Sequence, residues 1–503
     1  MIPLSIFAVD LMSENLLLLV SIMIIAAVFV AKAGSKLGTP SLLLFLILGM
    51  VVGKDGLGVE FTDYESAESI GHFAMTIILF SGGLQTSLKE TRPVMKQGIM
   101  LSTLGVFLMV LITGGFIWWV ARPFIGALGA TLLGCLLLAA VMASTDSISG
   151  FSVLHGKRMQ LRENLGPLLE LESGSNDPMA YLLTILLVKV LSGGGEVVTA
   201  HPSLTALTVL LLFVVQVAIG FGVGWLVGAG SRWLLSRIHL PGSALYAILI
   251  MSIAFFSNGI ASLLGGNGLL ALYVTAIRIG NMKDLPCRKD VLKFFDGMTW
   301  LMQLLMFLML GLLVDPSDML KVALPALAIG VFMMFVARPA TVFLCLLPFR
   351  DLSVKAKAFV SWVGLKGAGP ILFAMYPMVV GLEGASVIFN IVFFITLISL
   401  LAQGITLSPM ARWLGLSYDE DPEVETFGME IPDEMGMLRD HTVSEDDLLR
   451  GSTLRDMSLP HGIRVMMVRR GEHFLVPHGS MTLQEGDHLV IIVGESDDDL
   501  LES

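Results

Sequence analysis

The sequence is poor in charged side chains. Only 15% of its 503 residues are charged and 55% are hydrophobic, whereas a soluble globular chain carries roughly 25% charged residues. This deficit of charge is confined to the residues before 415. From Asp419 onward the chain is rich in charge, with 21 acidic residues and six arginines. The composition therefore excludes a wholly soluble protein and predicts a long membrane part followed by a short acidic tail in water.

Cysteine is scarce, and the motifs of several protein classes are missing. Cys135, Cys287 and Cys345 form no CxxC pair, so neither a disulfide framework nor a zinc site is indicated. The acidic tail argues against nucleic acid as a partner. There is no HExxH, GxSxG or GxxxxGK[ST] motif of an enzyme and no TVGYG-like channel filter. Residues 1–14 contain no basic side chain, so the first apolar run is predicted to be a retained helix, not a signal peptide.

Long apolar runs fill the first 415 residues. A helix needs about 20 apolar residues to cross a bilayer, and thirteen segments fit: 14–34, 39–53, 66–84, 97–120, 125–152, 163–193, 204–231, 242–257, 265–280, 291–314, 319–348, 356–380 and 385–411. The odd-numbered connections hold 18 basic residues and the even-numbered ones hold four. Since cytoplasmic loops are enriched in Lys and Arg, we expect the N-terminus outside and the tail in the cytoplasm.

Ionisable residues inside these segments are few. Each costs at least about 2.5–3.5 kcal/mol at bilayer depth and is a functional hypothesis by default. In the sixth span, Ser173 and Asp177 share one helix face, and Glu172 and Asn176 form the neighbouring column. Glu172 and Asp177 point about 140° apart. We therefore expect Asp177 with Ser173 to face a cation and Glu172 to pair with a base.

Three further spans carry ionisable residues. Arg338 lies in the eleventh span and is the best-placed partner for Glu172. The fifth and twelfth spans surround Asp146 and Lys366 with Ser, Thr, Gly and Pro, which weaken helices. If spans 1–6 and 8–13 are inverted repeats, these two spans are equivalent, and interrupted helices at equivalent positions indicate a transporter's site. Asp146 is expected to balance exposed helix N-termini, and Lys366 to balance C-termini.

These motifs resemble the NhaP-type branch of the cation:proton antiporter superfamily. The resemblance rests on four motifs in the family's order, which are Thr145-Asp146, Glu172 to Met179, Ala337-Arg338 and Ser361 to Ala368. It implies an all-α, dimeric membrane protein of thirteen helices with a core bundle of spans 4–6 and 11–13. One departure is Lys366, where the family usually has Arg, because a buried Lys can lose its proton. Its role therefore stays open between balancing a helix end and titrating.

The resemblance also implies roles for individual residues. Asp177 is the ion and proton carrier, Ser173, Asp146 and the carbonyl of Thr145 complete the site, and Glu172 pairs with Arg338. The monovalent cation is therefore expected at Asp177, Asp146 and Ser173. Asn176 stands where a second acid would be needed for two protons, so we expect electroneutral exchange of one cation for one proton.

The acidic tail resembles a TrkA-C domain. The motifs are Gly451 to Leu454, Arg469-Arg470-Gly471, Pro477-His478-Gly479 and Glu485 to Val490, with strands expected at Arg464 to Val468 and His488 to Val493. We therefore expect a membrane domain over residues 1–412, a linker over 413–430 and a small α+β cytoplasmic domain over 431–503. Such modules accompany K⁺ transport and often sense a small ligand.

The predicted function is antiport of a monovalent cation for H⁺ across a bacterial inner membrane. K⁺ is the first expectation for the cargo, Na⁺ or Li⁺ is the alternative, and a cation channel is a remote one. No cofactor and no enzymatic activity are expected. A sensor that is only anchored by its membrane part is a further alternative, in which deletion of the tail would remove the function and not merely its regulation.

Overall fold

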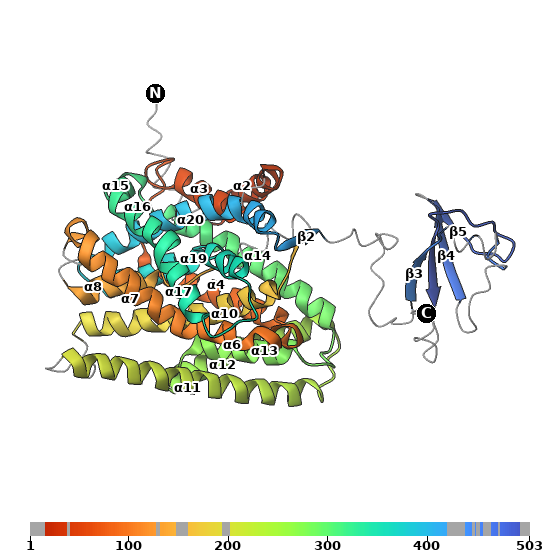
Figure 1. The fold of residues 1–503 in the computed structure, drawn as a ribbon, viewed down its shortest axis with the longest axis horizontal. Helices are drawn as coiled ribbons and strands as arrows, with labels where there is room; N and C mark the ends of the chain where they lie inside the picture. The colour runs from red at the N-terminus through yellow and green to blue at the C-terminus, as the bar shows by residue number, and fades with distance from the viewer. Residues whose placement is uncertain are drawn as a thin grey trace, which may run out of the picture. The chain divides into compact units, whose positions relative to one another are not determined.

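The computed structural model describes residues 16–37, 41–126, 131–146, 159–193, 202–419, 438–444, 448, 453–455, 464–470 and 473–492. The chain divides into two compact units, Met1–Asp419 and Glu420–Ser503. Within the described residues, the first unit is almost wholly helical and the second is a small sheet (Figure 1). The predicted fold class is confirmed, whereas the helical part expected of the α+β tail and the inverted repeats stay predictions.

The first unit is built from apolar helices joined by short connections. The helices are α2 (Leu16–Leu37), α3 (Ser41–Val52), α4 (Tyr64–Gln85), α5 (Leu88–Thr91), η1 (Arg92–Val94), α6 (Met95–Met100), η2 (Leu101–Gly105), α7 (Val106–Phe116), η3 (Ile117–Ala121), η4 (Arg122–Phe124), α8 (Leu132–Val141), α10 (Leu165–Leu191), α11 (Pro202–Leu235), α12 (Ser243–Leu263), α13 (Gly268–Gly280), α14 (Arg288–Leu312), α15 (Pro316–Lys321), α16 (Ala323–Phe332), η6 (Met333–Ala337), α17 (Arg338–Cys345), α18 (Val354–Trp362), α19 (Ala368–Val379) and α20 (Ala385–Leu414). Among the described residues, seven helices are long and apolar enough to cross a membrane, and five shorter ones are apolar. The count of thirteen spans stays a prediction.

Both spans that were expected to be interrupted lose their helical backbone. The fifth is helical only to the end of α8, and residues 143–146 have no regular structure. The rest of that span falls on residues 147–158, outside the described part. The twelfth breaks between α18 and α19 at residues 363–367. A backbone hydrogen bond of 2.8 Å from Asp146 N to Leu365 O joins the two irregular segments, so they lie against each other.

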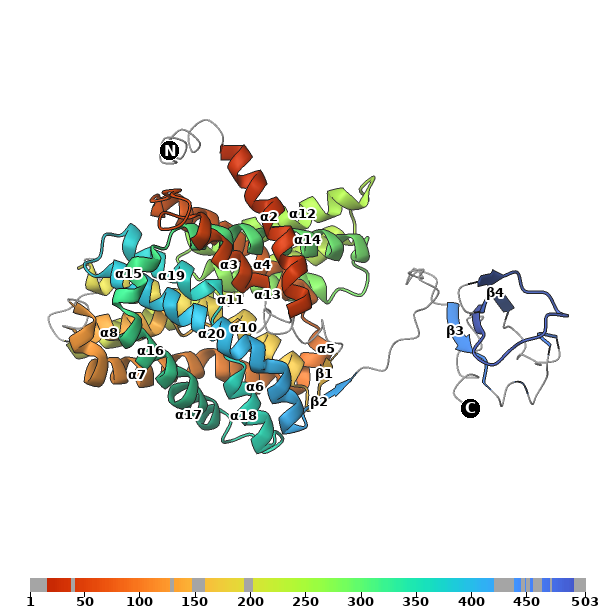
Figure 2. The ribbon, with the colours of Figure 1, turned by 90° about the horizontal axis from the view of Figure 1, so that it is seen from above.

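A short antiparallel sheet holds the end of the helical unit. β1 (Met159–Leu161), which leads into α10, pairs with β2 (Ser417–Asp419), which follows α20. Figure 2 shows α20 leading into β2. The amide of Arg162 also donates to Leu416 O at 2.8 Å, and Met159 and Leu416 are buried beside this pairing. The chain is thereby fixed at the last residues before the second unit.

The second unit has a four-stranded antiparallel sheet in the order β3-β6-β4-β5. Its strands are β3 (Leu438–Thr442), β4 (Arg464–Arg470), β5 (His473–Leu475) and β6 (His488–Ile492). Both expected strands are present; β4 continues two residues beyond its predicted end, and residue 493 lies outside the described part. Burial favours the neutral acid at Asp487, but hydrogen bonds from the Arg470 side chain and the Gln484 amide hold the pKa of Asp487 below its usual value.

Candidate functional site

Helix α10 presents the acidic motif to the interior of the helical unit. Pro178 inside α10 has no N–H, so the carbonyl of Gly174 loses its usual helical partner. Gly174 lies against Tyr273 of α13, where a Cβ would come within 2.5 Å of the ring. Asn267, the N-cap of α13, donates its side-chain amide to Pro178 O at 2.7 Å. α10 is thus fixed closely against α13 at the depth of Asp177.

Asp177 lies on the wall of a cavity of about 50 Å³. Ser144, Asp146 and Ser173 line the same cavity, together with Gln303 and with mainly apolar residues of α4, α14 and the start of α19. The hydroxyl of Ser144 donates to Asp177 Oδ1. The structure therefore brings Asp146, Ser173 and Asp177 to one cavity, although they come from two segments.

Reciprocal hydrogen bonds join the irregular segment after α8 to α10. Asn176 Nδ2 donates to Thr145 Oγ1 at 2.5 Å, and Thr145 N donates to Asn176 Oδ1 at 3.5 Å. Ser173 Oγ donates to Thr145 O at 2.9 Å. The single hydrogen of this hydroxyl points to Thr145 O, so Ser173 would bind a cation through its oxygen. A carbonyl, a hydroxyl and two carboxylates form an oxygen-rich set of the kind that hard cations prefer.

Lys366 belongs to the irregular segment between α18 and α19, and its side chain reaches the irregular segment after α8. Its Nζ donates to Ser144 O at 2.9 Å, a carbonyl just beyond the end of α8, and its N–H donates to Ser399 Oγ at 2.9 Å. Lys366 is only 5% exposed. A cation placed there compensates the negative end of the α8 dipole, which supports the helix-end role and leaves titration open.

Asp146 lies beside the start of α19. A Cβ at Gly367, the N-cap of α19, would come within 2.2 Å of Asp146 Oδ2, so only glycine fits there. A carboxylate next to a helix N-terminus is stabilised by the exposed amide groups and the helix dipole. The geometry matches the expected charge balance at this end.

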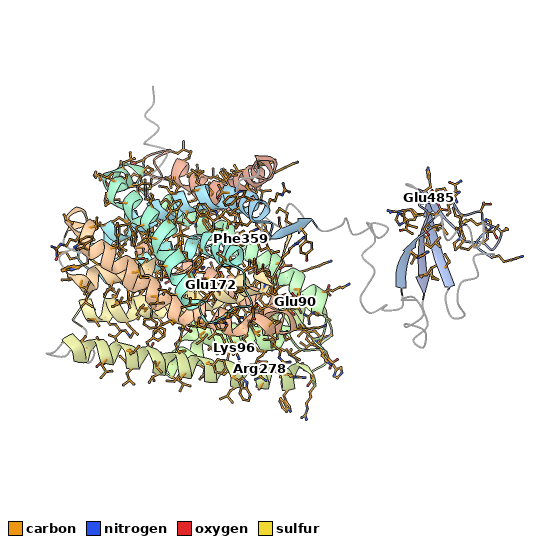
Figure 3. The ribbon with its side chains drawn as sticks, viewed as in Figure 1. Glu90, Lys96, Glu172, Arg278, Phe359 and Glu485 are labelled. Atoms are coloured by element: carbon orange, nitrogen blue, oxygen red, sulfur yellow. The ribbon has the colours of Figure 1, made fainter. Side chains whose placement is uncertain are left out.

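Glu172 and Arg338 form an ion pair away from the cavity. Arg338 Nη1 lies 2.6 Å from Glu172 Oε1, with the side chains 8% and 1% exposed. Arg338 directly follows the π-helical turn η6, and a Cβ at Gly364 would come within 2.8 Å of its Nε. Glu172 is labelled in Figure 3, and its side chain is buried in the helical unit. The expected contact is present, and its functional role remains a proposal.

Sequence reasoning missed several residues that support this site. The contacts of Ser144 with Asp177 and Lys366 were not expected, although Ser144 belongs to the polar run before Asp146. In α20, Ser399 donates to Gln403 Oε1 at 2.5 Å, and Gln403 Nε2 donates to Trp362 O at 2.8 Å. These two polar residues stand four apart in an apolar helix, a spacing that puts them on one face and was a usable signal.

Known proteins resemble this chain over most of its length. A family model described as sodium/hydrogen exchanger, transmembrane, matches residues 21–413, and one for the TrkA-C domain matches residues 438–502. The K(+)/H(+) antiporter NhaP2 of Shewanella oneidensis is 38% identical over 93% of this chain and 79% of its own. The K(+)/H(+) antiporter NhaP of Alkalimonas amylolytica is 36% identical over 92% and 75%, respectively.

A solved structure has the same helical architecture. The sodium proton antiporter MjNhaP1 from Methanocaldococcus jannaschii superposes with a TM-score of 0.66 at 21% identity, covering 78% of this chain and 97% of its own. At this identity the likeness concerns the fold alone. The helical unit therefore shares its fold with a solved antiporter structure.

Proposed function

Since the chain belongs to the sodium/hydrogen exchanger family, we propose that it exchanges K⁺ for H⁺ across the membrane through the carboxylate of Asp177. The observation that carries the proposal is the cavity where Asp177, Asp146 and Ser173 meet beside two stretches of irregular backbone. K⁺ is favoured over Na⁺ because relatives at 36% and 38% identity are K(+)/H(+) antiporters by name. The TrkA-C tail supports the same cargo.

One carboxylate serves both cargoes. A bare charge is expensive to hold in a low-dielectric interior, so Asp177 crosses the barrier readily only when a proton or a cation neutralises it. K⁺ binds the ionised form, with Thr145 O and Ser173 Oγ supplying neutral oxygen ligands as carbonyl oxygens do in other K⁺ sites. Proton and cation thereby compete, and this competition converts two separate fluxes into exchange.

Movement of the helical core exposes Asp177 to each side in turn. The paired charges of Glu172 with Arg338, and the contact of Lys366 with Ser144 O, keep the core together during that movement. Asn176 is occupied with Thr145 and carries no charge, which fits one proton for one cation. The protein works as a homodimer in the inner membrane, with its N-terminus outside and the tail binding a small regulatory ligand in the cytoplasm.

Proton movement in vesicles tests this function. Purified protein in liposomes containing a pH-sensitive dye receives K⁺, Na⁺ and Li⁺ in turn. We expect K⁺ to drive the fastest proton movement, and Asp177→Asn to abolish it because the amide binds neither cargo. Asp318→Asn, an exposed acid paired with Lys321, should leave it unchanged.

Three outcomes would contradict the proposal. Faster exchange with Na⁺ or Li⁺ than with K⁺ would show that K⁺ is not the preferred cation. Exchange that survives in correctly folded Asp177→Asn would show that Asp177 does not carry the ions. Single-channel currents in place of saturable counterflow would indicate a channel. Gel filtration of each variant serves as the folding control.

A further inference from the structure

A second polar cavity lies beyond the ion site. It measures about 160 Å³ and is lined by residues of α4, α10, α11, α12 and the start of α13, among them His72, Tyr181, Gln216, Asn258 and Asn267. Four of these five side chains fall inside segments expected to span the membrane, where polar groups are costly, and Asn258 directly follows one such segment. None of the roles assigned above to the ion site explains this collection of polar groups.

The two cavities follow one another along the same pair of helices. On α10, Asp177 lines the ion cavity and Tyr181 lines the second one, and residues four apart share a helix face. On α4, Met75 lines the first cavity and His72 the second. The rings of His72 and Tyr181 are 5.6 Å apart between centroids. The second cavity therefore begins one helical turn from Asp177.

Glu68 continues this polar line toward the start of α4. It precedes His72 by four residues on α4, so the two side chains share a helix face, and it is half-buried. α4 begins at Tyr64, so Glu68 is in the second turn. The distribution of basic residues predicts that this end faces the outside of the cell.

We propose that Glu68, His72 and Tyr181 line the outer access route through which K⁺ and H⁺ reach Asp177. The Glu68 carboxylate attracts monovalent cations to the outer mouth, because a single-sign charge in a low-dielectric cleft raises the local concentration of counter-ions. The hydroxyl of Tyr181 and the imidazole of His72 supply polar contacts over the last turn before Asp177. This inference rests on the proposed function and adds the residues that control outer access.

The test compares the two faces of the membrane. The initial exchange rate is measured against K⁺ concentration in right-side-out vesicles, which present the outer face, and in inverted vesicles, which present the inner face. In Glu68→Gln, we expect KM for K⁺ at the outer face to rise about five-fold, as loss of one nearby charge implies. KM at the inner face should stay within about two-fold of the wild-type value.

A neighbouring acid provides the control. Glu65 is on the same helix, carries the same charge and is exposed, so Glu65→Gln should leave KM unchanged at both faces. In the wild type, choline chloride should raise KM at the outer face alone, because salt screens the attraction. This second measurement decides the matter even if Glu68→Gln fails to fold.

Failure of the route differs from failure of the function. An unchanged outer KM in folded Glu68→Gln, or an equal rise at both faces, overturns the route while exchange itself stands. A wild-type protein that moves no protons with K⁺, Na⁺ or Li⁺ overturns the proposed function. An outer KM in the wild type that is insensitive to choline chloride also speaks against attraction by Glu68.

Discussion

The ion pair of Glu172 and Arg338 places two opposite charges in the interior of the helical unit. The charged atoms lie 2.6 Å apart, and both side chains are almost fully buried. Burying such a pair costs desolvation free energy, so the intact pair adds little net stability. Removing one partner destabilises the fold much more. Removing one partner leaves the other charge buried without compensation.

Glu172→Gln should therefore lower the free energy of unfolding by roughly 3–5 kcal/mol, because Arg338 stays charged. The measurement is thermal or denaturant unfolding in detergent, followed by tryptophan fluorescence. Asp318→Asn breaks an exposed ion pair with Lys321 and should leave stability almost unchanged. Equal losses in the two variants would show that the buried pair is not a structural anchor.

At this scale the sequence predicted contacts that follow from helix geometry. A helical wheel placed Glu172 and Asp177 on different faces of the helix. Because an unpaired buried charge is costly, Arg338 was predicted to pair with Glu172. The same reasoning missed the Ser144 hydroxyl on Asp177 and the Asn267 amide on Pro178 O. Those contacts join segments far apart in the chain, and no local spacing encodes which polar residues meet.

Two stretches of irregular backbone, one after α8 and one between α18 and α19, contribute to the candidate ion site. α8 ends at Val141 and α18 ends at Trp362, and each is followed by irregular backbone. The breaks fall where Ser, Thr and Gly collect, because these residues favour turns or lower the stability of a helix. Composition alone therefore located them. Lys366 donates to a carbonyl after α8 and Asp146 lies beside the start of α19, and their role in balancing the helix ends stays a prediction.

The β1–β2 pairing was not predicted. Each strand has three residues, and Gln160 pairs with Tyr418, which lies at the end of the first unit. Strands this short carry too few residues for an alternating pattern to register. Their pairing depends on how α10 and α20 are packed, which is a property of the tertiary structure.

Tyr418→Pro should open this pairing, because proline cannot donate a backbone hydrogen bond to a strand. We expect the amides of residues 159–162 and 416–419 to exchange hydrogen several-fold faster, as loss of about 1 kcal/mol per hydrogen bond implies. Tyr418→Thr keeps the N–H and a β-branched side chain and is the control. Unchanged exchange in the proline variant would mean that the two segments are held by their helices alone.

At the scale of the whole molecule, composition and hydropathy predicted the division into a helical membrane unit and a small sheet-containing tail. The deficit of charge reports the environment in which each part folds, so it needed no knowledge of contacts. The expected boundaries at residues 412 and 430 remain predictions, as do the dimer and the orientation in the membrane. The cavity is assembled from α4, α10, α14, the start of α19 and the segment after α8. This assembly depends on packing over the whole unit, so no pattern in the sequence predicted it.

The central claim is that Asp177 holds either a proton or a cation and never both. Detergent-solubilised protein in weakly buffered solution, with a pH-sensitive dye, reports protons released as K⁺ is added, and choline chloride controls for ionic strength. We predict about one proton released per bound K⁺ in the wild type, the value for a neutral carboxyl replaced by an ion pair, and none in Asp177→Asn. Release that persists in folded Asp177→Asn, or K⁺ binding to the wild type without release, would contradict the claim.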